Sequence, residues 1–185
     1  MPDALDFLIG DAKDVARQLI GWRFYHRMSN GELVGGTLSE TEAYHQDDAA
    51  SHAYNGLTER TRVMFGPPGH LYVYFTYGMH WCANIVTGPV GNAQAVLLRA
   101  LIPDNGIVIM RGRRPGRADK ELTSGPAKLC QALSISGADN SKPVGNEQTG
   151  EFVLLPPTRT YHVEATPRIG ITKNRDVLWR FVLLP

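Results

Sequence analysis

Apolar residues near the start of the chain recur about every three to four positions, which is the spacing of one face of an α-helix. Asp11 precedes this run and can cap the first turn, and Gly21 follows it and can end the helix. The sequence therefore predicts an amphipathic helix with one buried face. The apolar positions on that face are Ala12, Val15, Ala16, Leu19 and Ile20.

Most other apolar residues form short runs or alternate with polar residues, which is typical of β-strands. Ser29-Asn30-Gly31 predicts a turn between the first two strands, and Gly78-Met79-His80 predicts a hairpin tip between the third and fourth. Residues 45–68 are polar and end in Gly66-Pro67-Pro68-Gly69, so a loop is expected there. The predicted strands span residues 22–27, 33–44, 71–76, 81–87, 93–102, 151–155, 168–172 and 178–183.

Two more helices are expected after the fifth strand. Asp104 can cap a short helix that runs to Arg111, and Pro126 suits the first turn of a helix that runs to Leu133. Many strands with few helices predict an α+β fold around a mainly antiparallel sheet. We expect a single domain over residues 1–185, because a chain of this length can bury a sizeable core.

The composition is that of a globular protein, with 43% hydrophobic residues. No apolar run approaches the ~18 residues of a membrane span, and Arg99 interrupts the best candidate at 95–101, so no membrane partner is expected. Met1-Pro2-Asp3 lacks the positive region of a secretory signal. Cys82 and Cys130 form neither a disulfide framework nor a metal-spaced cluster, so we expect a reducing, cytoplasmic location.

The charge is unevenly distributed, although the net charge is only +1. Residues 1–98 hold 6 Lys/Arg against 10 Asp/Glu, whereas residues 99–185 hold 13 against 8. The basic excess can neutralise phosphates or can form an ordinary solvated surface. It is concentrated in Arg111, Arg113, Arg114, Arg117, Lys120 and Lys128.

Glu40, Glu42 and Tyr44 alternate along the second predicted strand, so their side chains point to one face of it. Two acids beside a tyrosine can form a polar cleft wall, in which a carboxylate acts as a general base on water. The same pattern also fits an edge strand that is protected from pairing by its charges.

Aromatic residues dominate the third predicted strand. Alternation places Leu71, Val73 and Phe75 inward, with Tyr72 and Tyr74 on the opposite face. Tyrosines on that face can stack on a nucleobase or can simply pack against their neighbours.

Tyr77 lies beside Gly78 at the expected hairpin tip, where it is poorly placed to join a core. An aromatic side chain displayed in this way is suited to insertion into a stack of bases.

Two polar residues interrupt apolar strands: Asn84 within 81–86 and Arg99 within 96–101. A polar group in such a position needs a partner. Arg99 can pair with Glu42 or Glu40 and hold a water between them, or it can form an ion pair that is only structural.

A metal site is a further hypothesis for the loop after the second strand. His45, Asp47, Asp48 and His52 offer imidazole and carboxylate ligands for a divalent ion. Their spacing matches no familiar ligand motif, so we expect neither a metal nor any other cofactor.

Seven sequence blocks occur in an order and spacing that resemble the alkyladenine (3-methyladenine) DNA glycosylase family. The resemblance extends from the helix at Asp11 to the last strand at Trp179-Arg180-Phe181. The ordered set is far more specific than any one block. The blocks are Glu40-Thr41-Glu42-Ala43-Tyr44, Ala49-Ala50-Ser51-His52, Met64-Phe65, Leu71-Tyr72-Val73-Tyr74 with Tyr77-Gly78-Met79, Asn84-Ile85, Leu97-Leu98-Arg99-Ala100-Leu101, and Ser124-Gly125-Pro126-Ala127-Lys128-Leu129-Cys130-Gln131-Ala132-Leu133.

The resemblance implies a single-domain fold with a curved antiparallel sheet, flanking helices and a protruding hairpin that intercalates into DNA. It assigns Glu42 as the general base and Arg99 as the partner that holds the attacking water. Tyr44, His52 and Tyr74 would form the walls of a base pocket.

The resemblance also assigns residues that choose the base and open the duplex. Asn84 would exclude normal guanine, and Tyr77 with Met79 would fill the gap left by a flipped nucleotide. The implied activity is hydrolysis of the N-glycosidic bond of alkylated or deaminated purines in double-stranded DNA: 3-methyladenine, 7-methylguanine, hypoxanthine and ethenoadenine. This reaction is the first step of base excision repair. A monomer is expected, associated with the nucleoid if the source is bacterial.

The distribution of lysines predicts base excision without strand cleavage. Residues between Lys13 and Lys120 contain no lysine, and a glycosylase that also cuts the strand usually needs an amine for a Schiff base. Lys128 would overturn this expectation if it folded into the cleft. Two other functions stay open: a non-catalytic module that binds DNA lesions, and a metal-dependent phosphoesterase built on Glu42 and the acidic loop.

Overall fold

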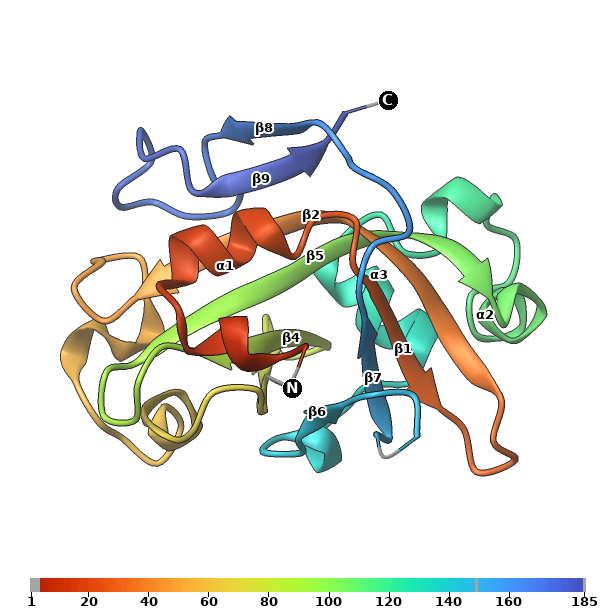
Figure 1. The fold of residues 1–185 in the computed structure, drawn as a ribbon, viewed down its shortest axis with the longest axis horizontal. Helices are drawn as coiled ribbons and strands as arrows, with labels where there is room; N and C mark the ends of the chain where they lie inside the picture. Colours follow the sequence, from red (N-terminus) through yellow and green to blue (C-terminus); the bar gives the residue numbers. More distant parts are fainter. Residues whose placement is uncertain (1–3, 149, 185) are drawn as a thin grey trace.

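The computed structural model describes residues 4–148 and 150–184, and nine strands of this part form one sheet (Figure 1). The prediction of one domain over residues 1–185 therefore includes residues 1–3, 149 and 185, which lie outside the described residues. The strands are β1 (Arg23–Arg27), β2 (Leu33–His45), β3 (Leu71–Thr76), β4 (His80–Thr87), β5 (Gln94–Asn105), β6 (Val144–Gly145), β7 (Phe152–Leu155), β8 (Val163–Thr166) and β9 (Arg180–Leu183).

Three α-helices and five short 3₁₀-helices accompany the sheet in the described part of the chain. The α-helices are α1 (Ala12–Gln18), α2 (Ile107–Arg113) and α3 (Pro126–Leu133). The 3₁₀-helices are η1 (Asp6–Ile9), η2 (His52–Asn55), η3 (Arg62–Phe65), η4 (Asp119–Glu121) and η5 (Gly137–Asp139). The predicted α+β class is confirmed.

The main path of the sheet has the strand order β3-β4-β5-β2-β1-β7-β6, and β9 joins it at β2 with β8 outside. Every pairing is antiparallel except the one between β6 and β7. The sheet is curved, so that the long strands β2 and β5 cross the molecule while β8 and β9 lie along one margin (Figure 1). The predicted mainly antiparallel sheet is therefore confirmed.

Strand β2 occupies the centre of the sheet. Its first half pairs with β1, residues 40–42 pair with β9, and nearly its whole length pairs with β5 on the other side. The register against β5 shifts on both sides of Glu40, and such irregularities re-aim side chains along a strand. The interpretation of this segment as an edge strand protected by its charges is therefore wrong, because neighbours cover both of its sides.

The predicted first helix is confirmed. Asp11 caps α1 by accepting a hydrogen bond from the Lys13 amide at 2.9 Å. The apolar face is buried, and Thr41 Oγ1 donates to the Ala16 carbonyl at 2.7 Å, which fixes the helix across β2 (Figure 1). The chain then turns at Gly21, which has a φ of +87° and leaves no room for a Cβ beside the ring of Tyr161.

Residues 168–172 do not form the predicted strand. The strand that pairs with β9 is β8, which lies earlier in the chain, and residues 168–172 form a loop. Arg168 is drawn into a buried ion pair with Asp48, and the amide of Ile169 donates to a side chain rather than to a neighbouring strand. These contacts with side chains replace the backbone ladder that alternation predicts.

Asp104 does not cap a helix. It is still part of β5, where it accepts a hydrogen bond from the hydroxyl of Tyr25 at 2.9 Å. The helix α2 begins after Gly106, whose left-handed φ of +70° ends the strand and turns the chain. The helix predicted at Pro126 is confirmed as α3, which lies beside β4 and β5.

The third and fourth strands form a hairpin, paired from Leu71↔Ile85 to Thr76↔His80. Its tip is therefore Tyr77-Gly78-Met79, one residue earlier than predicted. Leu71 and Val73 are buried as expected. The inward placement of Phe75 is wrong, because its side chain is 46% exposed and packs on Trp81, with ring centroids 4.7 Å apart. At Phe75 the hairpin already extends beyond the core, so alternation no longer predicts which side chains are buried.

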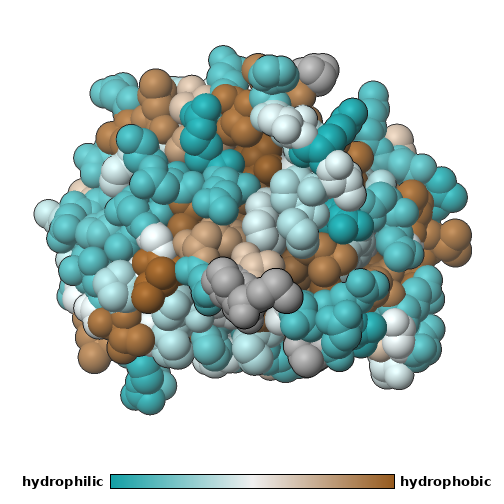
Figure 2. All heavy atoms as spheres, viewed as in Figure 1, coloured by the Kyte–Doolittle hydropathy of each residue, from teal (hydrophilic) through white to brown (hydrophobic). Residues whose placement is uncertain are grey.

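The face shown in Figure 2 is mainly hydrophilic, with hydrophobic side chains in small separate groups. Within residues 4–148 and 150–184, no helix has the length and apolar character that crossing a bilayer requires. The predicted loop 45–68 contains the two short helices η2 and η3, and Ala53 and Met64 in them are buried in a cluster with Tyr72 and Val86 of the sheet.

Candidate active site

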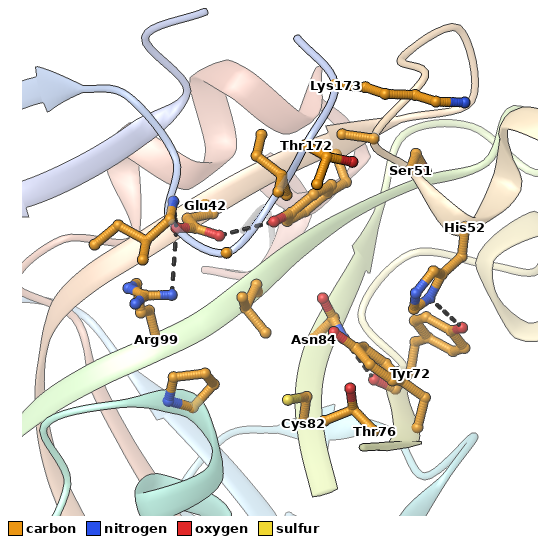
Figure 3. Close-up of a pocket in the computed structure, with 18 of the residues that line it drawn as sticks. Glu42, Ser51, His52, Tyr72, Thr76, Cys82, Asn84, Arg99, Thr172 and Lys173 are labelled. Carbon is orange, nitrogen blue, oxygen red and sulfur yellow. Dashed lines mark hydrogen bonds and ion pairs between the residues drawn. The ribbon is translucent and has the colours of Figure 1, made fainter. Parts of the chain in front are cut away.

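A cavity of about 490 Å³ opens beside the middle of β2, β4 and β5. The β3–β4 hairpin, the helix η2 and residues 169–173 complete its walls. Its size falls within the usual range of small-molecule sites, about 300–1,000 Å³. Glu42 and Arg99 lie at one end, and Asn84, Tyr72 and His52 lie at the other (Figure 3).

Glu42 is the most constrained side chain of this cavity. Its side chain has 0% exposure, and its two carboxylate oxygens have different partners. Oε1 accepts a hydrogen bond from the Ile169 amide at 2.9 Å and lies 3.4 Å from Arg99 Nη1, while Oε2 accepts from the Tyr44 hydroxyl at 2.8 Å. Burying a carboxylate is costly unless it is paired and hydrogen-bonded. Three groups meet that need here and fix the direction of the carboxylate.

Arg99 bridges both acids of the strand. Its Nε lies 3.3 Å from Glu40 Oε2, and its Nη1 faces Glu42. Glu40 in turn accepts two hydrogen bonds from Arg180, at 3.0 and 2.7 Å. The sequence left open whether Arg99 pairs with Glu42 or with Glu40, and in the structure it contacts both. Glu40 thus holds the arginine from behind, outside the cavity lining.

The opposite end of the cavity is aromatic. The His52 ring meets Tyr74 edge to face, with centroids 4.5 Å apart, and its Nδ1 lies 3.0 Å from the hydroxyl of Tyr72. The rings of Tyr72 and Tyr74 lie 5.5 Å apart, and the guanidinium of Arg60 covers Tyr74 at 5.3 Å. These contacts make this end of the cavity an aromatic surface, here called the ring slot, of the kind on which a planar base stacks.

Burial changes the ionisation of these groups. It lowers the pKa of His52 from 6.5 to about 4, with a smaller contribution from the charge of Arg60. It raises the pKa of Tyr44, where the charge of Glu42 adds to the effect, and it raises the pKa of Tyr74. At neutral pH His52 and Tyr74 are therefore uncharged, and the Tyr44 hydroxyl keeps the proton that it donates to Glu42.

Asn84 and Cys82 lie side by side on β4 with access to the cavity. Asn84 is buried, and its Nδ2 donates to the Tyr72 carbonyl at 2.9 Å, which fixes the side-chain amide against the floor (Figure 3). Cys82 is a free cysteine, and burial raises the pKa of its thiol. It therefore acts here as a small apolar surface rather than as a nucleophile.

The hairpin tip stands at the mouth of the cavity. Tyr77 lines the cavity while its side chain is 83% exposed, and Met79 is 68% exposed. Tyr77 has a left-handed φ of +50°, a conformation that costs a non-glycine residue about 1–3 kcal/mol. Backbone strain of this kind concentrates at functional sites, and here it displays a large aromatic ring to solvent.

The comparisons with known proteins agree with this constellation. A family model described as "Methylpurine-DNA glycosylase (MPG)" matches residues 6–184. The chain belongs to this family.

Relatives named "Putative 3-methyladenine DNA glycosylase" cover nearly the whole chain. One from Carboxydothermus hydrogenoformans is 48% identical over 96% of this chain and 92% of its own length. One from Agrobacterium fabrum is 49% identical over 96% of this chain and 86% of its own length. One from Rhodopseudomonas palustris is 47% identical, with 96% and 82% covered. The resemblance to the alkyladenine DNA glycosylases is thereby confirmed.

Within this methylpurine-DNA glycosylase, the structure brings most of the sequence-derived candidates to one place. Seven of them line the single cavity described above: Glu42, Arg99, Tyr44, His52, Tyr74, Asn84 and Tyr77. Met79 stays on the tip of the hairpin, outside the lining. Their shared location agrees with the roles that the family resemblance implies, and those roles remain predictions.

One wall of the cavity was not foreseen. Residues 169–173 line it, and Ile169 supplies the amide that binds Glu42. No local pattern points to these residues, since they lie far along the chain in a segment that reads as a strand. Tyr72 also contributes its hydroxyl to His52, although its sequence context suggested only an aromatic surface.

The segment 169–173 also bears on the prediction, made from the distribution of lysines, that the DNA strand is not cleaved. Lys173 lies among the cavity residues, so an amine is present at the rim, contrary to the premise that the site lies wholly between Lys13 and Lys120. Its ammonium end points away from Glu42 (Figure 3). Lys128 does not belong to the lining, and its Nζ donates to Ser124 Oγ at 3.1 Å.

The loop proposed as a metal site does not assemble into one. His45 pairs with Asp47 at 3.2 Å, while Asp48 pairs with Arg168 and His52 with Tyr72. Among the described residues, the group that comes within ligating reach is a different one, formed by His26, Asp139 and Glu151. A lysine amine, that of Lys142, lies 2.8 Å from both of its carboxylates and forms an ion pair with each.

The basic cluster is largely engaged within the protein. Arg111 forms a bidentate pair with Asp119, at 2.8 and 2.7 Å. Arg113 donates to the Ala132 carbonyl at 2.8 Å, and Arg114 to Gln131. Only the pair with Asp119 offsets a positive charge, so Arg113 and Arg114 keep their charge while their guanidinium groups are partly engaged within the protein.

Proposed function

We propose that the chain is a monofunctional DNA glycosylase that hydrolyses the N-glycosidic bond of alkylated or deaminated purines in double-stranded DNA. One observation carries the proposal: a fully buried carboxylate, Glu42, held on both oxygens, faces a cavity whose far wall is a slot of uncharged rings. A general base for water and a binding site for a planar base thus share one chamber.

The target bond lies inside a duplex, so the nucleotide must leave the stack before it reaches Glu42. Flipping costs a few kcal/mol and is easiest for a damaged base. Stacking on aromatic side chains returns about 1–3 kcal/mol per base, and the rings of Tyr44, His52 and Tyr74 are available for it. Tyr77 and Met79, exposed at the hairpin tip, would occupy the space that the base leaves.

Glu42 then serves the chemical step. As the bond to the base lengthens, positive charge develops on the sugar, as in other glycoside cleavages. The carboxylate stabilises this charge and accepts a proton from the attacking water. Arg99 offsets the cost of burying Glu42 and, with the Ile169 amide, restricts where that water can sit.

Electron-poor purines fit the chamber best. The slot has aromatic faces and a neutral His52, and aromatic faces attract a cationic methylated base, although the guanidinium of Arg60 lies over Tyr74. Bases such as 3-methyladenine and 7-methylguanine are in addition good leaving groups. Hypoxanthine and ethenoadenine would bind through stacking alone, with Asn84 at the floor to select among base edges.

The proposal is tested by incubating the protein with methylated duplex DNA and separating released bases by chromatography, with and without a chelator. Free 3-methyladenine at equal rates in both is the expected result. Cleavage of the DNA backbone that chelator abolishes, without release of free base, would instead support the metal-dependent phosphoesterase. Tight binding of the lesion without any release would support a non-catalytic lesion-binding module.

A further inference from the structure

Among the described residues, Arg168 is the most buried cation, and it lies behind the wall of the cavity. Its side chain has 0% exposure, and its ion-pair partner Asp48 has 2%. Arg168 Nη1 donates both to Asp48 and to the Ala43 carbonyl, the latter at 2.9 Å. Asn174 donates to the other oxygen of Asp48 at 2.6 Å. Burial acts to raise the pKa of Asp48, but these hydrogen bonds outweigh it and hold the pKa below the ordinary value.

The same guanidinium lies over two aromatic rings. Its central carbon is 4.8 Å from the ring centre of Tyr44 and 5.3 Å from that of Trp179. Its Nε and Nη2 have no hydrogen-bond partner among the described residues, which leaves the ring faces to stabilise that part of the cation. Tyr44 is thus covered on one side by Arg168 while it lines the cavity with another part of its ring.

Two neutral groups donate hydrogen bonds to Glu42, and both lie next to this arginine. Tyr44, stacked on the guanidinium, donates its hydroxyl to Oε2. Ile169, the next residue in the chain, donates its amide to Oε1. A shift of Arg168 would therefore move the two contacts together, while the third contact, from Arg99 on β5, would stay.

We infer that Arg168 is a positioning residue for Glu42: locked by Asp48 and the Ala43 carbonyl, it holds Tyr44 and the Ile169 amide in the places from which they aim the carboxylate. The catalytic part of this inference rests on the proposed function. The geometric part, which concerns the Ile169 amide alone, does not depend on it. Lysine could keep the charge pair with Asp48, but it lacks the planar guanidinium that stacks on the rings of Tyr44 and Trp179.

The test compares Arg168→Lys with the wild type by two readouts. The first is amide hydrogen exchange at Ile169 in DNA-free protein, resolved by NMR. We expect a protected amide in the wild type and loss of that protection in Arg168→Lys. The second is single-turnover release of 3-methyladenine, expected to fall about tenfold to hundredfold, the scale of a misplaced catalytic group. Affinity for DNA with an abasic site should stay within about twofold, because the phosphate contacts are untouched.

A matched control separates positioning from simple loss of stability. Asp139 is also a buried carboxylate with a cationic partner, Lys142, and it does not line the cavity. Asp139→Asn should lower the thermal midpoint yet leave both readouts unchanged below that midpoint. If Arg168→Lys does not fold, Asp48→Asn removes the ion pair while it keeps the guanidinium, and the same two losses are expected in weaker form.

A double-mutant cycle with Tyr44→Phe shows whether Arg168 acts through Tyr44. Because the two residues serve one contact, the combined rate loss should be smaller than the product of the single losses. Unchanged protection at Ile169 together with an unchanged single-turnover rate in Arg168→Lys would overturn the inference. If the wild type releases no base at all, the proposed function fails, and amide exchange alone still decides whether Arg168 holds the Ile169 contact.

Discussion

Tyr44 and Glu42, two positions apart on β2, are joined by a hydrogen bond of 2.8 Å from the tyrosine hydroxyl to the carboxylate. Residues at this spacing lie on the same face of a strand, so the local geometry of β2 brings the two side chains together. The relationship places a general-base candidate and a wall of the base slot on one rigid element. A site built on a strand in the middle of a sheet is held more exactly in place than one built on a loop.

Tyr44→Phe isolates this hydrogen bond, because it removes the hydroxyl and keeps the ring. A hydrogen bond to a charged group contributes about 1.5–3 kcal/mol. We therefore expect the single-turnover rate of base release to fall at least about tenfold, with little change in the binding of damaged DNA. An equal loss of rate and affinity would show that the hydroxyl contacts the base rather than the carboxylate.

The ionisation of His52 gives a second prediction. Its pKa of about 4 keeps the ring neutral through the physiological range. As the pH falls from the ordinary value of 6.5 toward 4, the unfolded chain takes up the proton first. His52 should therefore lower stability across that window and have no such effect above it. NMR titration of the ring should place its midpoint near 4, and Arg60→Gln should move it upward; a wild-type midpoint near 6.5 would contradict the burial argument.

The hairpin tip gives a third prediction. Tyr77→Ala and Met79→Ala change exposed side chains, so the thermal midpoint should stay within a few degrees of the wild type. Release of damaged base from duplex DNA should fall, with a smaller effect on single-stranded DNA, in which no stack must be opened. Val108→Ala, at a hydrophobic residue of α2 that is 77% exposed and outside the cavity, is the matched control and should change neither rate. Equal losses on both substrates would assign the tip a role other than intercalation.

Strand cleavage is the subject of a fourth prediction. Lys173 brings an amine to the rim, but its end is directed away from Glu42 (Figure 3). We therefore expect the abasic product to stay uncut, and borohydride should trap no covalent complex with DNA. A trapped complex that disappears in Lys173→Ala would show that the lysine reaches the sugar and that the enzyme is bifunctional.

Local sequence patterns were sufficient for the elements whose contacts lie close along the chain. The cap at Asp11 and the proline at the start of α3 each predicted a helix that the structure contains. The alternation of Glu40, Glu42 and Tyr44 correctly grouped two cavity residues with the acid that holds Arg99 from behind. In each case a single element supplies the physical cause, so the sequence could be interpreted without its surroundings.

The features that failed depend on partners far along the chain. Residues 168–172 alternate like a strand, but Arg168 forms a buried pair with Asp48, 120 positions away, and the residues after it line the cavity. Phe75 has an inward position by alternation, but the hairpin leaves the core before that residue. Asp104 has a good capping side chain, but Tyr25 on β1 holds it in β5. Tertiary contacts override local preference at each of these points.

The measurement that tests the account most directly is single-turnover release of 3-methyladenine from methylated duplex by Glu42→Gln. Glutamine keeps the shape of the side chain but cannot accept the proton of water, so the account predicts a rate lower by at least about a hundredfold with DNA binding retained. Glu164→Gln, at an exposed acid of β8 outside the cavity, should match the wild type. Release by Glu42→Gln at the wild-type rate would contradict the account.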